Sequence, residues 1–168
     1  AATMAGMRDD ALYAAETVSP KVPLEVARAV PFIQNAIVMP QLTRLTFGEW
    51  DELLEIPAPD TSLHLARFMH AYARGTALAA LGRRDEARAL LGELRTAARE
   101  AAATAGGDES ANPVLSIAAH ALAGEIALRA GEPAVAAERF RRAVQIEDGM
   151  VYEEPPLWYY PLRHSLGR

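Results

Sequence analysis

The chain has 168 residues, with 17 lysines and arginines against 22 aspartates and glutamates, so its formal net charge is −5. This acidic balance disfavours nucleic acid as a partner, because protein surfaces that bind the negatively charged phosphate backbone are generally basic. The absence of cysteine excludes disulfides and thiolate chemistry, and no apolar run is long enough to predict membrane insertion. The chain opens with Ala1 and has no recognisable signal peptide, so localisation stays open, with the cytoplasm favoured.

The N-terminal third is the least regular part of the sequence. We expect a helix from Gly6 to Val18, which Ser19-Pro20 breaks. Further prolines interrupt the apolar segment that follows: Pro23, Pro31 and Pro40. Between them the pattern predicts a short helix at about 23–30 and a longer one at about 32–46, bent near its internal proline.

The middle of the chain is expected to hold a short helix and then a long one. The short helix, Trp50–Glu55, is stopped by Ile56-Pro57-Ala58-Pro59. Its tryptophan is interpreted as a packing anchor between helix pairs, the alternative being a platform for a ligand. Asp60-Thr61-Ser62 then predicts the cap of a long helix at about 63–81, which ends at a glycine.

A highly charged helix is expected next, from about Asp85 to Thr104. Gly106-Gly107-Asp108 ends this helix, and a polar connection leads on to Asn112. Its charges are interpreted as a solvated, ion-paired outer face. The charged residues are Arg83, Arg84, Asp85, Glu86, Arg88, Glu93, Arg95, Arg99 and Glu100.

The clearest pattern is a pair of helices at about 113–130 and 133–147, hinged at Gly131. Asn112-Pro113 is a strong helix start, because asparagine can accept hydrogen bonds from the first free amides. The first helix is rich in small residues, which allow a neighbouring helix to approach closely. The second places an apolar set on one face: Val135, Ala136, Phe140, Ala143, Val144 and Ile146. Neither helix buries its apolar surface alone, so the pair requires neighbours.

The glycine of this hinge, with a small or apolar residue five positions later, recurs along the chain. The pairs are Gly6 and Ala11, Gly48 and Leu53, Gly82 and Ala87, and Gly131 and Ala136. Gly48 and Gly82 are 34 residues apart, whereas the other two intervals are 42 and 49 residues. The register therefore predicts repeated helix pairs, two of which carry insertions.

Leu122-Ala123-Gly124, Gly131, Ala136, Phe140 and Ala143 resemble the tetratricopeptide repeat (TPR) pattern, which has a 34-residue period and an A-x3-F element. The resemblance implies an all-α fold in which antiparallel helix pairs stack into a right-handed superhelix, an α-solenoid. It implies one domain over 1–168, divided into a partial repeat at 1–18, repeats at about 21–59, 60–107 and 112–149, and a partial repeat at 150–168.

The C-terminal segment EPPLWYYPLRHSLG is similar to bacterial TPR proteins in which such repeats form one stretch of a longer array. The chain is accordingly expected to be a fragment of such an array. Trp158, Tyr159 and Tyr160 are expected to pack between repeats. The alternative is that this proline-aromatic run is an extended docking peptide for another domain.

No residue pattern predicts chemistry. The histidines are scattered at His64, His70, His120 and His164, and no His-x3-His pair suggests a metal site. Adjacent carboxylates at Asp9-Asp10, Asp51-Glu52 and Asp85-Glu86 fit helix starts, where negative charge is favourable. There is no glycine-rich phosphate loop and no nucleophile elbow. We therefore expect neither an enzyme nor a cofactor nor a bound metal.

The TPR resemblance implies a protein-interaction scaffold that binds a peptide or helical segment of another protein in a concave groove. The residues carried over to groove positions are Asn35, Met69, Tyr72, Thr76, Glu125, Arg129 and His164. TPR proteins that grip chaperone tails use lysine and asparagine at such positions; here Tyr72, Thr76, Ala121 and Glu125 take their place, so that specificity is not expected. The alternatives are a structural spacer that self-associates into a homo-oligomer through incomplete terminal repeats, and a ligand- or metal-sensing regulatory domain.

Overall fold

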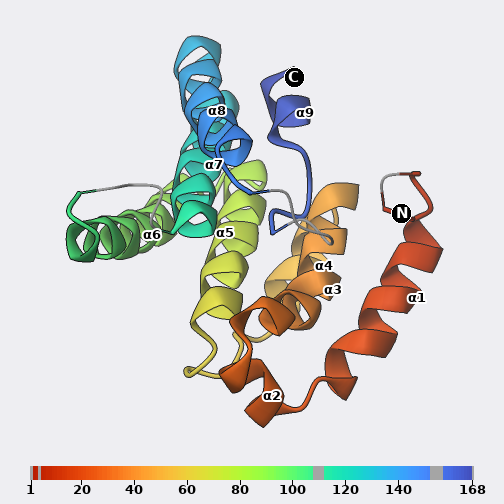
Figure 1. The fold of residues 1–168 in the computed structure, drawn as a ribbon. Coiled ribbons are helices and arrows are strands. Elements are labelled where there is room, and N and C mark those ends of the chain that lie inside the picture. Colours follow the sequence, from red (N-terminus) through yellow and green to blue (C-terminus); the bar gives the residue numbers. More distant parts are fainter. Residues whose placement is uncertain (1, 4, 108–111, 152–156, 168) are drawn as a thin grey trace. The chain divides into compact units, whose positions relative to one another are not determined.

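The computed structural model describes residues 2–3, 5–107, 112–151 and 157–167, and within these ranges every element is helical. The chain divides into two compact units, Ala1–Ala77 (unit 1) and Leu78–Arg168 (unit 2), and the boundary falls inside helix α5, His64–Ala80 (Figure 1). The all-α prediction is confirmed for the described residues, whereas the stacking of helix pairs into a solenoid stays a prediction. Across the same residues, no helix combines the length and apolarity that crossing a membrane requires.

Unit 1 is built around α3, against which α1 and α4 pack (Figure 1). Its elements are α1 (Arg8–Val18), the 3-10 turn η1 (Ser19–Lys21), α2 (Leu24–Ala29), the 3-10 turn η2 (Pro31–Ile33), α3 (Gln34–Phe47), α4 (Trp50–Glu55) and the first part of α5. The helix predicted at 32–46 is thus divided, because Pro31 starts a tight 3-10 turn before the α-helix begins. Pro40 lies inside α3, and the predicted bend there stays a prediction.

The predicted cap of α5 is wrong in one respect. The Asp60 carboxylate accepts the backbone N–H of Ser62 at 2.9 Å and so closes the turn that precedes the helix. The hydrogen bonds from Ser62 also hold the pKa of Asp60 below its usual value. The helix begins later, at His64, where the carbonyl of Leu63 accepts the N–H of Arg67 at 2.9 Å. Asp60 therefore shapes the turn, since it lies too far upstream to cap the first free amides.

In unit 2 each helix packs against the next along the chain: α6 on α7, α7 on α8, and α8 on α9. Their bounds are α6 (Arg84–Thr104), α7 (Pro113–Arg129), α8 (Pro133–Asp148) and α9 (Leu162–Leu166). The predicted cap of α7 is confirmed, because the Asn112 side chain accepts the N–H of Leu115 at 3.3 Å. The predicted connection over 108–111 and residues 152–156 of the proline-aromatic run lie outside the described residues.

The apolar face predicted for α8 is confirmed apart from one residue. Ala136, Phe140, Ala143, Val144 and Ile146 are buried, but Val135 is 40% exposed. It borders a hollow whose other wall includes Ala127 of α7 and Ala130, which directly follows that helix. These methyl groups are too short to cover the valine, so it stays in contact with solvent.

The recurrent glycines form the same turn at all four positions. Gly6, Gly48, Gly82 and Gly131 have φ angles of 73°, 76°, 78° and 80°, in the left-handed region that favours glycine. At each, the next residue donates its N–H to the carbonyl five residues before it: Met7 to Ala2 (3.0 Å), Glu49 to Arg44 (3.1 Å), Arg83 to Leu78 (2.8 Å) and Glu132 to Ala127 (2.9 Å). This is the Schellman arrangement, which satisfies carbonyls at a helix end.

Each glycine turn also starts the following helix in the same way. Helices α1, α4, α6 and α8 all begin two residues after the glycine. The residue five positions after each glycine is buried and donates its N–H to the carbonyl of the residue that follows the glycine; these residues are Ala11, Leu53, Ala87 and Ala136. The acidic pairs predicted at helix starts lie in the first turns of α1, α4 and α6. The sequence register thus corresponds to one repeated glycine turn, which joins two helices at Gly48, Gly82 and Gly131 and precedes α1 at Gly6.

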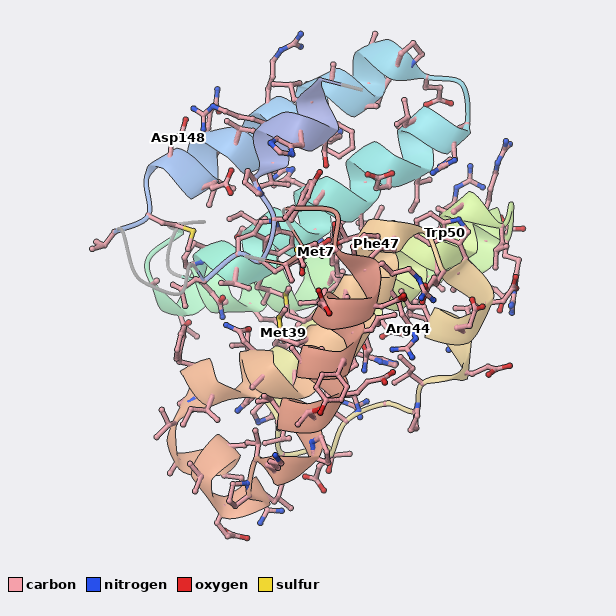
Figure 2. The ribbon with its side chains drawn as sticks, turned by 90° about the vertical axis from the view of Figure 1, so that its right-hand side faces the viewer. Met7, Met39, Arg44, Phe47, Trp50 and Asp148 are labelled. Atoms are coloured by element: carbon pink, nitrogen blue, oxygen red, sulfur yellow. The ribbon has the colours of Figure 1, made fainter. Side chains whose placement is uncertain are left out.

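Trp50 packs onto its own junction. A Cβ built on Gly48 would lie 3.5 Å from Cζ2 of the Trp50 indole, which is ordinary van der Waals contact. Figure 2 shows Phe47, where α3 ends, and Trp50, where α4 begins, close to this turn. The interpretation of Trp50 as an anchor between repeats stays a prediction.

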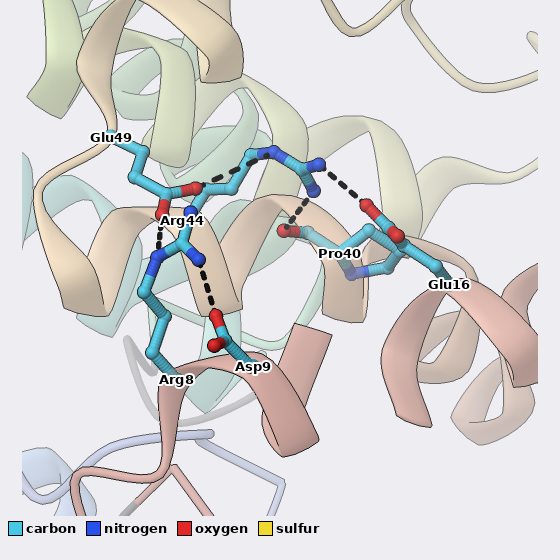
Figure 3. A network of polar contacts seen from close by, with 6 residues as sticks. All are labelled: Arg8, Asp9, Glu16, Pro40, Arg44 and Glu49. Atoms are coloured by element: carbon cyan, nitrogen blue, oxygen red, sulfur yellow. Dashed lines mark hydrogen bonds and ion pairs between the residues drawn. The ribbon is translucent and has the colours of Figure 1, made fainter. Parts of the chain in front are cut away.

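An ion-pair network joins α1 to α3 in unit 1 (Figure 3). The Arg44 guanidinium lies 2.5 Å from the Glu16 carboxylate on α1, donates to the Pro40 carbonyl at 3.3 Å, and lies 3.8 Å from Glu49. Glu49 also accepts a hydrogen bond from Arg8. The side chains of Arg44 and Glu49 are only 19% and 14% exposed, so solvent screens their interaction weakly.

Arg44→Met is expected to reduce the stability of the α1–α3 contact by about 1–2 kcal/mol, because it leaves a largely buried carboxylate with one partner fewer. Arg28→Met is the matched control. Arg28 also contacts two carboxylates, Glu25 and Asp60, but all three side chains are well exposed, so a loss below about 1 kcal/mol is expected. Hydrogen exchange of α1 and α3 amides measures both effects; equal losses in the two variants would contradict this ranking.

Candidate functional site

The residues predicted to line a groove differ widely in exposure. Met69, Tyr72, Thr76 and Glu125 are buried, with exposed fractions of 1, 6, 6 and 4%. Asn35 is half-buried, and Arg129 and His164 are exposed. Glu125 is buried because α7 is enclosed along most of its length, from Val114 to Ala127. The seven side chains therefore do not all face solvent, and their binding role stays a prediction.

Polar side chains of α3 reach α5 within unit 1. Gln34 donates its amide to the Ala27 carbonyl at 2.9 Å and accepts the N–H of Ala66 at 3.1 Å. Gln41 accepts a hydrogen bond from Nδ1 of His70 at 2.8 Å. All three polar side chains are buried, so they position α5 against α3 rather than face a ligand.

His70 is expected to make folding depend on pH. Burial, followed by the nearby Arg74 and Arg67 guanidinium groups, lowers the pKa of His70 from 6.5 to about 4. Between pH 6.5 and about pH 4, the unfolded chain takes up a proton on His70 that the folded chain does not bind. Stability is therefore complete above pH 6.5 and falls as the pH drops towards 4, by up to about 3 kcal/mol.

Urea unfolding at a series of pH values, compared between wild type and His70→Gln, measures this contribution. Glutamine does not titrate, so the variant should lose less stability than wild type between pH 6.5 and 4. His64→Gln makes the same substitution at an exposed histidine of the same helix and is the control for the change of side chain itself. A His70→Gln slope identical to wild type would contradict the assignment.

The C-terminal residues of unit 2 are fastened to α8. Arg163 makes two hydrogen bonds to the Asp148 carboxylate, at 2.7 and 2.8 Å, and the Leu162 N–H donates to Glu147 at 3.3 Å. His164 bonds the Tyr160 hydroxyl through Nδ1 at 2.9 Å, and the two rings meet edge to face. Trp158 is buried, which agrees with a packing role, although packing between repeats stays a prediction.

A groove that the sequence did not predict lies between α6 and α7. It encloses about 990 Å³ and is lined by Gly92, Arg95 and Arg99 of α6, Ala119 and His120 of α7, and Arg139 of α8, among others. Two smaller hollows of about 430 and 380 Å³ adjoin it and share Arg139 with it. The three hollows therefore meet at Arg139 on unit 2.

Small residues on two helices create the groove. Along α6 the groove is lined by Gly92, Ala98, Ala102 and Ala103, and along α7 by Ser116 and Ala119. Such side chains leave a trough where larger ones would fill the space between the helices. The Arg84 guanidinium donates to the Arg129 carbonyl at 3.1 Å and joins the start of α6 to the end of α7. The groove therefore lies between two helices that this hydrogen bond joins at one end.

Among the described residues, the charged side chains that line the groove are all cationic. The described residues that line it include Arg95, Arg99 and Arg139 and no carboxylate. Burial first, then Arg139 and Arg99, lowers the pKa of Arg95. The two neighbours lower this pKa because like charges disfavour the charged form, so Arg99 and Arg139 each lie close enough to Arg95 to repel it.

The sequence contained a signal for this groove. Arg88, Arg95 and Arg99 follow each other at helical spacing with Gly92 between them, so one face of α6 is basic and hollowed. The charges of α6 were interpreted as a solvated, ion-paired face, and that is confirmed for Arg83 with Glu86 and Arg88 with Asp85. Arg95 and Arg99 differ from Arg83 and Arg88 in that they line the groove, whose opposite wall is formed by residues of α7 and α8.

In the part of the chain that the structure describes, no cluster of three or more histidine or carboxylate side chains is arranged to hold a metal ion. Comparisons with known proteins add no assignment of the site: no family model, curated protein or solved structure matches the chain.

Proposed function

We propose that the chain is a non-catalytic protein-binding module made of TPR-like helix pairs. The glycine turns support the repeat assignment, because four of them share one geometry, three of these join two helices, and two are 34 residues apart, the TPR period. Nearest-neighbour packing of α6, α7, α8 and α9 agrees with an array in which each helix contacts the next. A peptide or helical segment of another protein is the proposed ligand.

The observation that carries the binding role is the groove between α6 and α7. Its volume of about 990 Å³ lies at the upper end of the range of ligand pockets, about 300–1,000 Å³. Its small lining residues let a second backbone approach closely, as in helix-in-groove recognition. The proposed ligand site is therefore this groove, which solvent can reach, rather than the predicted first-helix positions, four of which are buried.

Selection from a displayed peptide library, compared between two substitutions at one residue, tests this function. Gly92 lines the groove, and a Cβ added there would meet no atom within 4 Å. Gly92→Trp should therefore fill the trough, whereas Gly92→Ala should leave it open. Selected peptides should bind wild type and Gly92→Ala alike and bind Gly92→Trp at least about tenfold more weakly, a loss of about 1.4 kcal/mol. A selection that yields only peptides insensitive to Gly92→Trp would contradict the proposal.

Self-association is the second candidate, favoured by apolar side chains exposed on unit 1. They lie on or beside α1 and α2: Met7, Tyr13, Val18, Leu24, Val26 and Val30. Exposed apolar patches commonly mark protein interfaces. Light scattering should then find a dimer that Val18→Asp with Val26→Asp dissociates and that Val151→Asp, at a residue 83% exposed in unit 2, leaves intact. A monomer at all concentrations would exclude this candidate.

A further inference from the structure

We infer that the groove between α6 and α7, walled by Arg95, Arg99 and Arg139 and called here the arginine groove, binds an acidic peptide segment of a partner protein. This inference rests on the proposed function and specifies the chemistry of its ligand. It depends on a contrast in charge, since the chain as a whole carries −5 while the groove wall is cationic.

The arginines of the groove lack the carboxylate partners that six other arginines of the chain have. Carboxylates pair with Arg8, Arg28, Arg44, Arg83, Arg88 and Arg163. Within the described ranges no ion pair joins a carboxylate to Arg95, Arg99 or Arg139. Arg99 instead donates to the Arg95 carbonyl at 3.3 Å and the Thr96 hydroxyl at 3.2 Å. These neutral partners orient the guanidinium group but leave its charge uncompensated.

Repulsion among the groove arginines raises the free energy of the unliganded protein, and binding of an anionic ligand would lower it. The Arg99 and Arg139 guanidinium groups each repel that of Arg95, and solvent screens part of this repulsion because Arg95 and Arg99 are exposed. A ligand carboxylate placed among them gains attraction from each and can accept paired hydrogen bonds from the planar guanidinium. The charge complementarity therefore selects an acidic ligand over a neutral or basic one.

The spacing of the arginines suits a peptide. Arg95 and Arg99 are four residues apart on α6, so their positions differ by about 6 Å along the helix axis. Carboxylates one turn apart on a ligand helix, or two residues apart on an extended ligand, have a spacing of about 6–7 Å. Arg139 lies on α8, so the ligand would be contacted from more than one side.

Carboxylates interrupt the positive surface on both sides of the groove, which limits the ligand. One smaller hollow carries Glu138 beside Arg141 and Arg142, and the other carries Glu132 beside Arg88. A long polyanion such as nucleic acid would meet these carboxylates and the net negative charge of the chain. A short acidic segment, in contrast, can place its carboxylates in the groove, between Glu132 and Glu138.

The test compares two fluorescein-labelled, alanine-based peptides of about 20 residues, long enough to become partly helical. One carries glutamates four residues apart, and the other carries glutamines at the same positions. Binding is measured by fluorescence anisotropy to wild type, to Arg95→Glu with Arg139→Glu, and to Arg83→Glu. Arg83 is the control because it begins the same helix but does not line the groove. A labelled oligodeoxythymidine and light scattering of the unliganded chain complete the set.

The inference expects the glutamate peptide to bind at least about tenfold more tightly than the glutamine peptide. Binding should weaken by a similar factor in the double variant, stay within about twofold in Arg83→Glu, and weaken as salt rises. Equal binding of the two peptides, insensitive to the double variant, would overturn the acidic specificity while the Gly92→Trp result still decides the binding function. Preferred binding of the oligodeoxythymidine, or a dimer that the double variant dissociates, would overturn it in favour of nucleic acid or a second copy of this chain.

Discussion

Phe140→Ala is expected to lower the free energy of unfolding of unit 2 by about 3–5 kcal/mol, as is usual for a phenylalanine lost from a core. The Phe140 ring is 2% exposed and forms a buried cluster with Ala127 and Ala136, against which Leu128 and Leu166 also pack. The alanines around it are too small to move into the vacated space. Most of the lost volume would therefore remain as a cavity, which adds to the lost hydrophobic transfer energy.

Urea unfolding followed by tryptophan fluorescence measures this loss. In a Trp50→Phe background, Trp158 of unit 2 is the remaining tryptophan of the two in the chain. Val135→Ala is the control on the same helix, because Val135 is 40% exposed and should cost less than about 1 kcal/mol. Similar losses for Phe140→Ala and Val135→Ala would contradict the packing described for α8.

Gly124→Ala is expected to destabilise unit 2 by up to about 2 kcal/mol, although alanine is the better helix former. A Cβ on Gly124 would lie 2.7–2.9 Å from three carbon atoms of the Phe140 ring, closer than such atoms can approach. Overpacking of this kind costs about 1–3 kcal/mol, and the gain in helix propensity offsets about 1 kcal/mol of it.

Gly92→Ala is the matched control, since Gly92 also lies inside a helix but faces open space. This substitution should stabilise the chain by about 0.5–1 kcal/mol, so the two alanine variants should differ in sign. Phe140→Leu should also reduce the cost of Gly124→Ala, because a smaller side chain opposes the new methyl group. Two stabilising glycine-to-alanine changes would contradict the close approach of α7 and α8.

Local signals in the sequence predicted the helices and their ends. Glycines at positions that require a left-handed backbone mark the ends of α3, α5 and α7, and Asn112 caps α7 as expected. These features depend on residues a few positions apart, so spacing alone reveals them. Asp60 shows the limit of such reasoning, because its carboxylate serves the turn before α5 rather than the helix itself.

The candidate site could not be predicted in the same way, because it depends on which faces of α6, α7 and α8 meet. The sequence assigned Arg95 and Arg99 to a solvated face and left Arg139 outside the core, and neither statement shows that the three share one groove. Glu125 illustrates the converse. A residue assigned to a binding surface is buried, since α7 is enclosed by its neighbours.

The most direct test of the account is a nuclear magnetic resonance titration of the isotopically labelled chain with the tightest Gly92-dependent peptide. The account predicts saturable shifts in the amides that line the groove, among them Gly92, Thr96, Ala119 and His120, with α1 to α4 unchanged. Saturable shifts confined to α1–α4, or to residues remote from α6 and α7, would contradict the claim that this groove is the binding site.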